Sequence, residues 1–206
     1  SNVRETGKPV KKCLHGQTTK RGNKMGIIQK IDFLILNWLQ KHLRGKTLDI
    51  LMPMITALGN GGFLFALLTI GLLCTRRWRR EGVAVGFSLL LCLLAGNLFL
   101  KPLVGRIRPY DLVDGFQLLI KPLPDYSFPS GHTMAAFACA GVFWHYRQMF
   151  GGWSNVMMGL AVLMGFSRLY LYVHFPTDVL CGALLGLLAS WTGVRLTESL
   201  CALKLK

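Results

Sequence analysis

The sequence predicts an all-α, polytopic membrane protein with about five transmembrane helices and an N-terminal amphipathic interfacial helix. Of its 206 residues, 52% are hydrophobic and only 16% are charged. Several apolar runs approach the roughly 20 residues that a helix needs to cross a bilayer. We find no series of short alternating strands of the kind that predicts a membrane β-barrel.

The chain is strongly basic, with a formal net charge of +15. Basic residues near the ends of membrane helices set the topology and attract anionic lipid headgroups. We therefore expect the positive charge of this chain to interact with the lipid bilayer. No nucleic-acid-binding module is recognisable, and we predict no nucleic-acid partner. The six cysteines form no CxxC pair and lie mostly in apolar runs, which predicts neither a metal site nor a disulfide framework.

Residues 1–24 form a basic, polar tail, which we expect to be poorly ordered or non-native. No apolar segment typical of a cleaved signal peptide follows them. Residues 25–206 are predicted to form a single membrane-embedded domain. Its first part, residues 27–43, has apolar positions at helical spacing but a fully apolar centre too short to span, so we expect an amphipathic helix lying in the interface.

The first predicted crossing covers residues 47–75 and contains a glycine-rich break at 59–62. Close packing of helices is the role we favour for these glycines, with shaping of a lipid entrance as the alternative. The second crossing begins at Val83. It is expected to end near Lys101, because Pro102 disfavours helical geometry at the residue before it.

Three further crossings are predicted at 133–146, 156–173 and about 176–194, after an outer loop at 102–128. Four arginines within residues 76–80 place that short loop in the cytoplasm, and the C-terminus with it. The protein is therefore expected in the plasma membrane. Five crossings put the basic tail outside, against the positive-inside tendency, and a sixth crossing at 27–43 would remove this conflict.

One short polar stretch, 167–178, lies between two apolar runs and contains Arg168, His174 and Asp178. Ionisable groups at membrane depth are costly and usually mark function. The predicted topology brings this stretch to the extracytoplasmic face, together with Lys101, Arg108 and the helix start at 130–132. Residues far apart in the sequence would thus converge at one depth, as an active site requires.

The residue types suit a phosphate group. Lys101, Arg108 and Arg168 supply positive charge, and arginine can hold phosphate oxygens in a bidentate fork. At Ser130-Gly131-His132, free N–H groups of a helix start can bind an anion.

The two histidines suit nucleophilic and proton-transfer chemistry. Asp178 follows His174 by four residues and can hold one ring nitrogen, which leaves the other as nucleophile or base. His132 could give a proton to a leaving oxygen.

Three motifs resemble those of the type 2 phosphatidic acid phosphatase family: KPLVGRIRP at 101–109, PSGH at 129–132 and SRLYLYVHFPTD at 167–178. The resemblance implies that His174 attacks phosphorus to form a phosphohistidine, that Asp178 orients it and that His132 protonates the leaving group. It implies that the phosphate oxygens are held by Lys101, Arg108, Ser130, Gly131 and Arg168. It implies no metal or other cofactor.

A site at the membrane interface predicts a membrane lipid substrate. We favour undecaprenyl diphosphate, with phosphatidylglycerophosphate and phosphatidic acid as alternatives. A lipid phosphotransferase would share the same residues and differ only in its acceptor. A non-enzymatic anion transporter would need a charged path across the bilayer, whereas these charges gather at one face. The sequence does not predict the oligomeric state.

Overall fold

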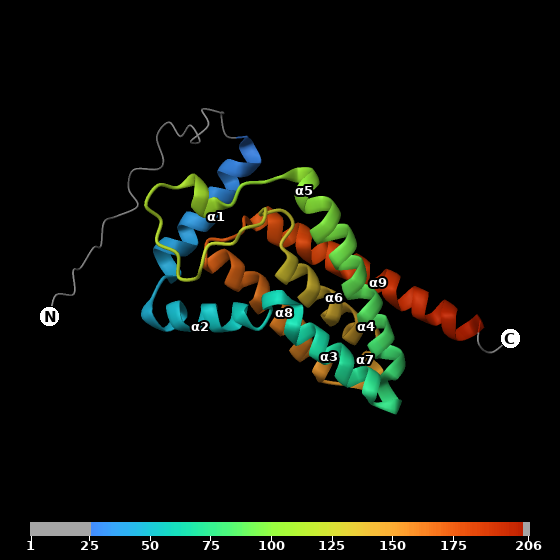
Figure 1. Cartoon of the computed structure of the whole chain (residues 1–206). Coiled ribbons are helices and arrows are strands. Elements are labelled where there is room, and N and C mark those ends of the chain that lie inside the picture. The colour runs from blue at the N-terminus through green and yellow to red at the C-terminus, as the bar shows by residue number, and fades with distance from the viewer. Residues whose placement is uncertain (1–25, 204–206) are drawn as a thin grey trace.

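The structure is a computed structural model that describes residues 26–203, and the basic tail at 1–24 lies outside this range. Within the described residues all regular structure is helical, which confirms the predicted class. Figure 1 shows a bundle of helices, with α1 and the long loop after α5 together at one end.

The first helix, α1 (Ile27–Leu43), has the predicted bounds. One face is buried through Phe33 and Leu36, while apolar side chains such as Ile27 and Leu34 are exposed on another. The buried face also carries the charged residue Asp32, which is 1% exposed. Placement of α1 in the membrane interface stays a prediction.

The glycine-rich break separates α2 (Lys46–Ala57) from α3 (Phe63–Cys74), with the short η1 (Asn60–Gly62) between them. Gly61 and Gly62 have φ angles of 61° and 70°, in the left-handed region that favours glycine. A Cβ added at either glycine would meet no atom within 4 Å, so close helix packing is the wrong explanation for this pair. Their role is to let the chain change direction between α2 and α3 (Figure 1).

The next helical run comprises η2 (Arg76–Trp78), α4 (Arg79–Leu91), η3 (Cys92–Leu100) and α5 (Lys101–Val104). The predicted end near Lys101 is wrong by about one turn, and the helix stops instead at Gly105, which has a φ of 57°. The segment η3 is a π-helix. Pro102 lies just after the change from π to α geometry, where the register of the backbone hydrogen bonds shifts and a proline is tolerated.

The remaining elements are η4 (Pro109–Leu112), α6 (Gly131–His145), α7 (Arg147–Phe150), α8 (Trp153–Tyr170) and α9 (Pro176–Leu203). Helix α6 packs against both α8 and α9, and α9 also packs against α4. A Cβ added at Gly186 would lie 2.3 Å from the Met134 carbonyl oxygen, so glycine permits the close approach of α9 to α6. This contact brings the starts of both helices together.

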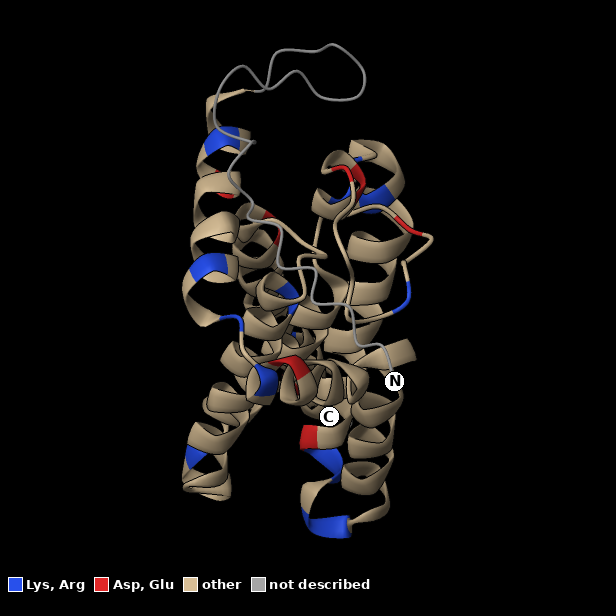
Figure 2. Cartoon of the chain, turned by 90° about the vertical axis from the view of Figure 1, so that its left-hand side faces the viewer, with Lys and Arg blue, Asp and Glu red and all other residues tan. Residues whose placement is uncertain are grey.

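Three helical stretches are long and apolar enough to cross a membrane: Lys46–Cys74, Arg76–Leu112 and Pro176–Leu203. Helices α6 and α8 lie between the second and third of these stretches, and they have 15 and 18 residues. The count of five crossings therefore stays a prediction. Figure 2 shows long stretches of helix without charged residues, as a membrane protein requires.

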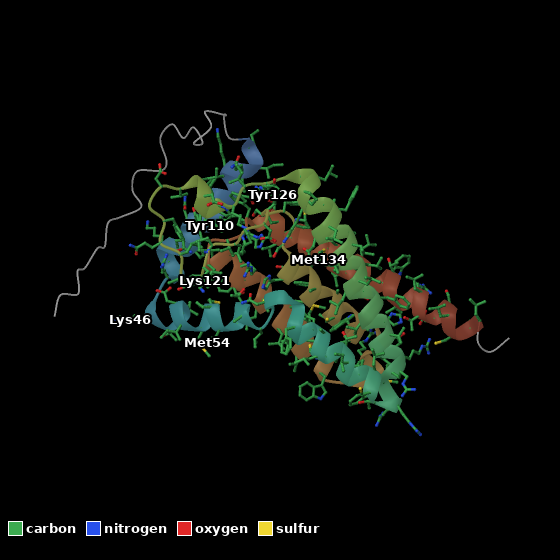
Figure 3. All side chains as sticks on the ribbon, viewed as in Figure 1. Lys46, Met54, Tyr110, Lys121, Tyr126 and Met134 are labelled. Atoms are coloured by element: carbon green, nitrogen blue, oxygen red, sulfur yellow. The ribbon has the colours of Figure 1, made fainter. Side chains whose placement is uncertain are left out.

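The loop between α5 and α6, called the outer loop after its predicted side, covers one end of the bundle. Phe116, from its predicted apolar patch, stacks on Tyr172 with ring centroids 4.3 Å apart. The Tyr110 hydroxyl accepts a hydrogen bond from the Leu123 N–H (3.0 Å) and donates one to the Leu123 carbonyl (3.1 Å), which ties the loop to itself. Figure 3 shows Tyr110 and Tyr126 at this end of the molecule.

Candidate active site

A cavity of about 560 Å³ opens beneath the loop, and six of the eight predicted site residues line it. They come from five elements or connections that are distant in the sequence. The six are Lys101, Arg108, Gly131, His132, Arg168 and His174. The structure therefore brings the three motifs to one place.

Ser130 and Asp178 lie behind the cavity wall, and both side chains are 0% exposed. The Ser130 N–H donates to the Asp178 carbonyl oxygen (3.2 Å), and its hydroxyl lies 2.8 Å from the Thr133 hydroxyl. The expectation that a free Ser130 N–H binds phosphate is therefore wrong. The N–H groups of Gly131 and His132 begin α6, where no intrahelical acceptor is available to them.

His174 is held by a backbone carbonyl. Its Nδ1 lies 2.6 Å from the Ser127 carbonyl oxygen and 3.8 Å from Asp178 Oδ2. A carbonyl only accepts hydrogen bonds, so Nδ1 carries the proton, and Nε2 carries a lone pair that faces Arg108 Nη1 at 3.2 Å. The contact that we expected between Asp178 and the ring is present at 3.8 Å, and Ser127 adds a second connection, because its hydroxyl donates to Asp178 Oδ2 (2.5 Å).

The His174 ring is neutral at physiological pH. Burial is the main cause that lowers its pKa to about 3; Asp178 opposes this shift, and the charges of Arg168 and Arg108 add to it. A buried imidazole beside arginines loses its proton because the charged form is poorly solvated and repelled. A neutral ring with an unprotonated Nε2 can act as a nucleophile.

Arg108 lies between His174 and the outer loop. Its Nη1 donates to the Val173 carbonyl (2.7 Å) and lies 3.2 Å from His174 Nε2. Its Nη2 pairs with Asp125 Oδ1 (2.5 Å), and its Nε donates to the Asp125 carbonyl (2.8 Å). The guanidinium thus reaches both the histidine and the loop carboxylate.

Asp125 also forms an ion pair with Lys101. Burial opposes ionisation of this carboxyl, but hydrogen bonds and charges from Lys101 and Arg108 outweigh it and lower the pKa to about 2. The Asp125 side chain is 45% exposed and lines the cavity. One carboxylate therefore bridges two of the three cations expected to bind phosphate.

Arg168 is the third cation, and its side chain lacks full partners. Only 1% of the residue is exposed. Its Nη1 donates to the Thr56 hydroxyl (2.5 Å), while Nε and Nη2 are buried without a hydrogen-bond partner. Buried polar groups are normally satisfied, so these two N–H groups indicate a place for an anion.

His132 faces the site from α6. Its Nε2 lies 3.1 Å from Asn60 Oδ1, in the glycine-rich break. An added Cβ at Gly59 would lie 2.6 Å from His132 Cδ2. The glycine at position 59 therefore leaves room for this ring, a packing role that differs from the conformational role of Gly61 and Gly62.

Comparison with known proteins identifies this arrangement. The model of the PAP2 superfamily matches residues 81–200, more than half of the chain. The chain belongs to the PAP2 superfamily. It is accordingly a lipid phosphatase, and it is a membrane protein.

Relatives within the PAP2 superfamily include an undecaprenyl-diphosphatase from Sulfolobus acidocaldarius, 30% identical over 74% of this chain and 72% of the relative. A PAP2-type phosphatidylglycerolphosphate phosphatase from Bacillus subtilis has a similar structure, with a TM-score of 0.68 and 29% identity over 85% of this chain and 88% of that one. Aquifex aeolicus LpxE is also similar, with a TM-score of 0.65 and 29% identity over 83% and 96% of the two chains.

Sequence reasoning missed several groups that surround the three PAP2 motifs. Asp125 and Ser127 stand just before the PSGH motif. Their position beside this motif could have indicated a role in the site, whereas their residue types alone could not. Thr56 and Asn60 are ordinary polar residues of the first predicted crossing, and nothing in the sequence links them to Arg168 and His132. Two further charged residues lie outside the cavity: Arg106 contacts Asp178, and Asp32 contacts Arg106.

Proposed function

We propose that this PAP2 phosphatase hydrolyses undecaprenyl diphosphate at the extracytoplasmic face of the plasma membrane through a phosphohistidine at His174. The observation that carries the proposal is the state of His174. Its Nδ1–H is held by Ser127, its unprotonated Nε2 lies 3.2 Å from Arg108 Nη1, and the residue lines a cavity shared with Lys101, Arg108 and Arg168. A nucleophile surrounded by fixed cations is suited to attack on a phosphate group.

In the first step the Nε2 lone pair attacks phosphorus, and the bond from phosphorus to the leaving oxygen breaks. His132 gives a proton to that oxygen as a general acid. In the second step a water attacks the phosphohistidine, His132 takes a proton from the water, and the P–N bond breaks. Inorganic phosphate leaves, and both histidines return to their starting states. The three cations stabilise the charge on the equatorial oxygens in both steps. No metal is needed in this sequence of steps.

The cavity also suits the lipid part of the substrate. Besides the polar groups, its wall contains apolar side chains from α3, α4, η3 and α6, among them Phe65, Leu89, Leu93 and Ala135. A lipid whose phosphate reaches Arg168 would place its first carbons against these side chains. The relatives named as undecaprenyl-diphosphatases support the polyprenyl substrate.

The arginines at 76–80 are the basis for placing the active site at the extracytoplasmic face of the membrane. They lie at the far end of α4, η3 and α5 from the outer loop and its cavity. The positive-inside tendency puts these arginines in the cytoplasm and therefore puts the cavity at the outer face.

The test is a substrate panel with the purified chain in detergent and EDTA. We expect kcat/KM for phosphate release from undecaprenyl diphosphate to exceed that from phosphatidylglycerophosphate and phosphatidic acid by about tenfold or more, a difference of about 1.4 kcal/mol in transition-state binding. The second candidate is phosphatidylglycerophosphate, favoured by the B. subtilis structure. If phosphatidylglycerophosphate is hydrolysed faster, undecaprenyl diphosphate is rejected as the preferred substrate, while the phosphohistidine mechanism is unaffected.

A second prediction concerns Asp125, which occupies the cations that the substrate phosphate needs. Replacement of Asp125 by Asn should lower the concentration of orthovanadate or inorganic phosphate that gives half-inhibition by about tenfold, because no carboxylate then competes for Lys101 and Arg108. The control is Asp111→Asn, which removes an exposed carboxylate from the same loop and should leave inhibition unchanged. Weaker inhibition of Asp125→Asn would mean that Asp125 instead holds the cations in their binding geometry.

A further inference from the structure

A carboxylate on α1 is buried beside the site although no expected reaction step uses it. Asp32 is 1% exposed, and its neighbours on the helix are apolar. Its Oδ1 accepts the Thr177 N–H (3.0 Å), and its Oδ2 accepts the Thr177 hydroxyl (2.7 Å) and Arg106 Nη2 (2.6 Å). A buried charge is tolerated when it is fully paired in this way.

Arg106 connects this carboxylate to the site. Its Nη2 pairs with Asp32, while its Nη1 pairs with Asp178 Oδ1 (2.5 Å). Its guanidinium carbon lies 4.0 Å from the centre of the Phe175 ring, and Phe33 of α1 packs edge-on against the same ring at 5.2 Å. The planar fork of arginine is therefore fixed between two carboxylates from opposite ends of the chain.

Asp178 in turn has its geometry fixed by three donors. They are Arg106 Nη1 on Oδ1, and the Ser127 hydroxyl and the Phe175 N–H (2.9 Å) on Oδ2. Oδ2 lies 3.8 Å from His174 Nδ1. When Nε2 bonds to phosphorus, the ring becomes positively charged, and a carboxylate at this distance stabilises the charge without removing the proton.

We infer that Asp32 and Arg106 are positioning residues for lipid phosphate hydrolysis, through which α1 fixes Asp178 beside His174. The inference deepens the proposed function and rests on His174 as the nucleophile. Asp32 acts twice: through Arg106 on the Asp178 side chain, and through Thr177 on the first turn of α9 that carries Asp178. Helix α1 lies outside residues 81–200 that match the PAP2 model, so this contribution comes from beyond the matched region.

The test separates positioning from stability by measuring kcat and KM independently. Asp32→Asn and Arg106→Gln are expected to lower kcat by about 10- to 100-fold with KM changed less than about threefold, because the phosphate-binding cations stay in place. Arg106→Lys keeps the charge but loses the fork, and we expect partial recovery of kcat. The double variant should lose less than the product of the two single losses, since Asp32 and Arg106 share the contact between Arg106 and Asp178.

The matched control is Gln40→Ala. Gln40 also anchors α1 to the rest of the chain, through a hydrogen bond from its Nε2 to the Tyr170 carbonyl (2.7 Å), but it does not contact Arg106. This variant should lower the melting temperature and leave kcat unchanged. The melting temperature of every variant is measured in the same detergent, and kinetics are taken well below it.

Two outcomes overturn the inference. One is a kcat for folded Asp32→Asn within twofold of that of the unchanged chain. The other is an equal loss of kcat in Gln40→Ala, which would show that any loosening of α1 has the same effect. All variants are assayed on whichever lipid phosphate the unchanged chain hydrolyses fastest, so a wrong choice of lipid in the proposed function does not affect the result. Failure of the nucleophile itself is detected separately, by His174→Ala.

Discussion

Replacement of His174 by Ala is expected to lower phosphate release from a lipid phosphate by about 10⁴-fold or more, with the protein still folded. A nucleophile that forms a covalent intermediate cannot be bypassed, so only slow direct attack by water remains. The neutral ring, with Nδ1 held at 2.6 Å by Ser127, gives the attacking nitrogen its lone pair and its direction. The measurement is phosphate release in detergent with EDTA present.

The matched control for this experiment is His145→Ala. His145 lies at the end of α6 away from the cavity and pairs with Glu198 at 3.6 Å. Its replacement should leave phosphate release unchanged within about twofold, because it removes an imidazole far from the reaction. Turnover of His174→Ala close to that of the unchanged chain would reject the phosphohistidine mechanism. In the unchanged chain, rapid quenching should trap phosphate on the protein in an acid-labile, base-stable form, as a phosphoramidate bond requires.

Replacement of Arg168 by Met is expected to abolish most activity and to make the substrate-free protein more stable. Without substrate, Nε and Nη2 of Arg168 are buried and unpartnered. An uncompensated buried charge destabilises a protein, and even a buried ion pair can be replaced by apolar side chains of similar volume with no loss or a gain of about 1–4 kcal/mol. We therefore expect the melting temperature to rise by a few degrees, while kcat/KM falls by about 10³-fold as a fixed donor to the phosphate is lost.

Two comparisons make the Arg168 prediction specific. Inorganic phosphate should raise the melting temperature of the unchanged chain by binding its folded form, and this increase should disappear in Arg168→Met. Arg195→Met serves as the control, because the Arg195 side chain is 65% exposed and its partners, Glu198 at 3.8 Å and the Trp191 ring, lie on the same helix α9. It should change neither stability nor activity appreciably. A lower melting temperature for Arg168→Met would show that Arg168 holds the bundle together rather than an anion.

Part of the fold was predictable because it depends on local pattern. The helix at 27–43 follows from apolar residues at helical spacing, and its bounds agree with α1. The end of the second crossing was not predictable from Pro102, because the π-helix η3 shifts the backbone register there and only Gly105 ends the helix. The glycines at 59–62 were recognised as a break, but their separate roles depend on which atoms approach each one.

The site, like the fold, could be predicted from the sequence only in part. Motif spacing and topology were sufficient to predict that Lys101, Arg108, His132, Arg168 and His174 meet, and they line one cavity. The availability of the Ser130 N–H was predicted wrongly, because its acceptor is a carbonyl of α9, 48 positions further along the chain at Asp178. The contact of Asp178 with His174 was also predicted and is present at 3.8 Å, but the shorter contact of Nδ1, at 2.6 Å with the Ser127 carbonyl, was not predicted.

The sequence by itself determined that this chain is a helical membrane protein with a phosphate-binding, histidine-containing site, because hydropathy and short motifs are properties of neighbouring residues. Only the tertiary structure decided which groups complete that site. Asp32 reaches Arg106 across 74 residues of sequence, and Thr56 reaches Arg168 across 112. Such pairs form because the packing of α1 and α2 on the rest of the bundle buries charges that must then find partners, and no local pattern specifies which partners they find.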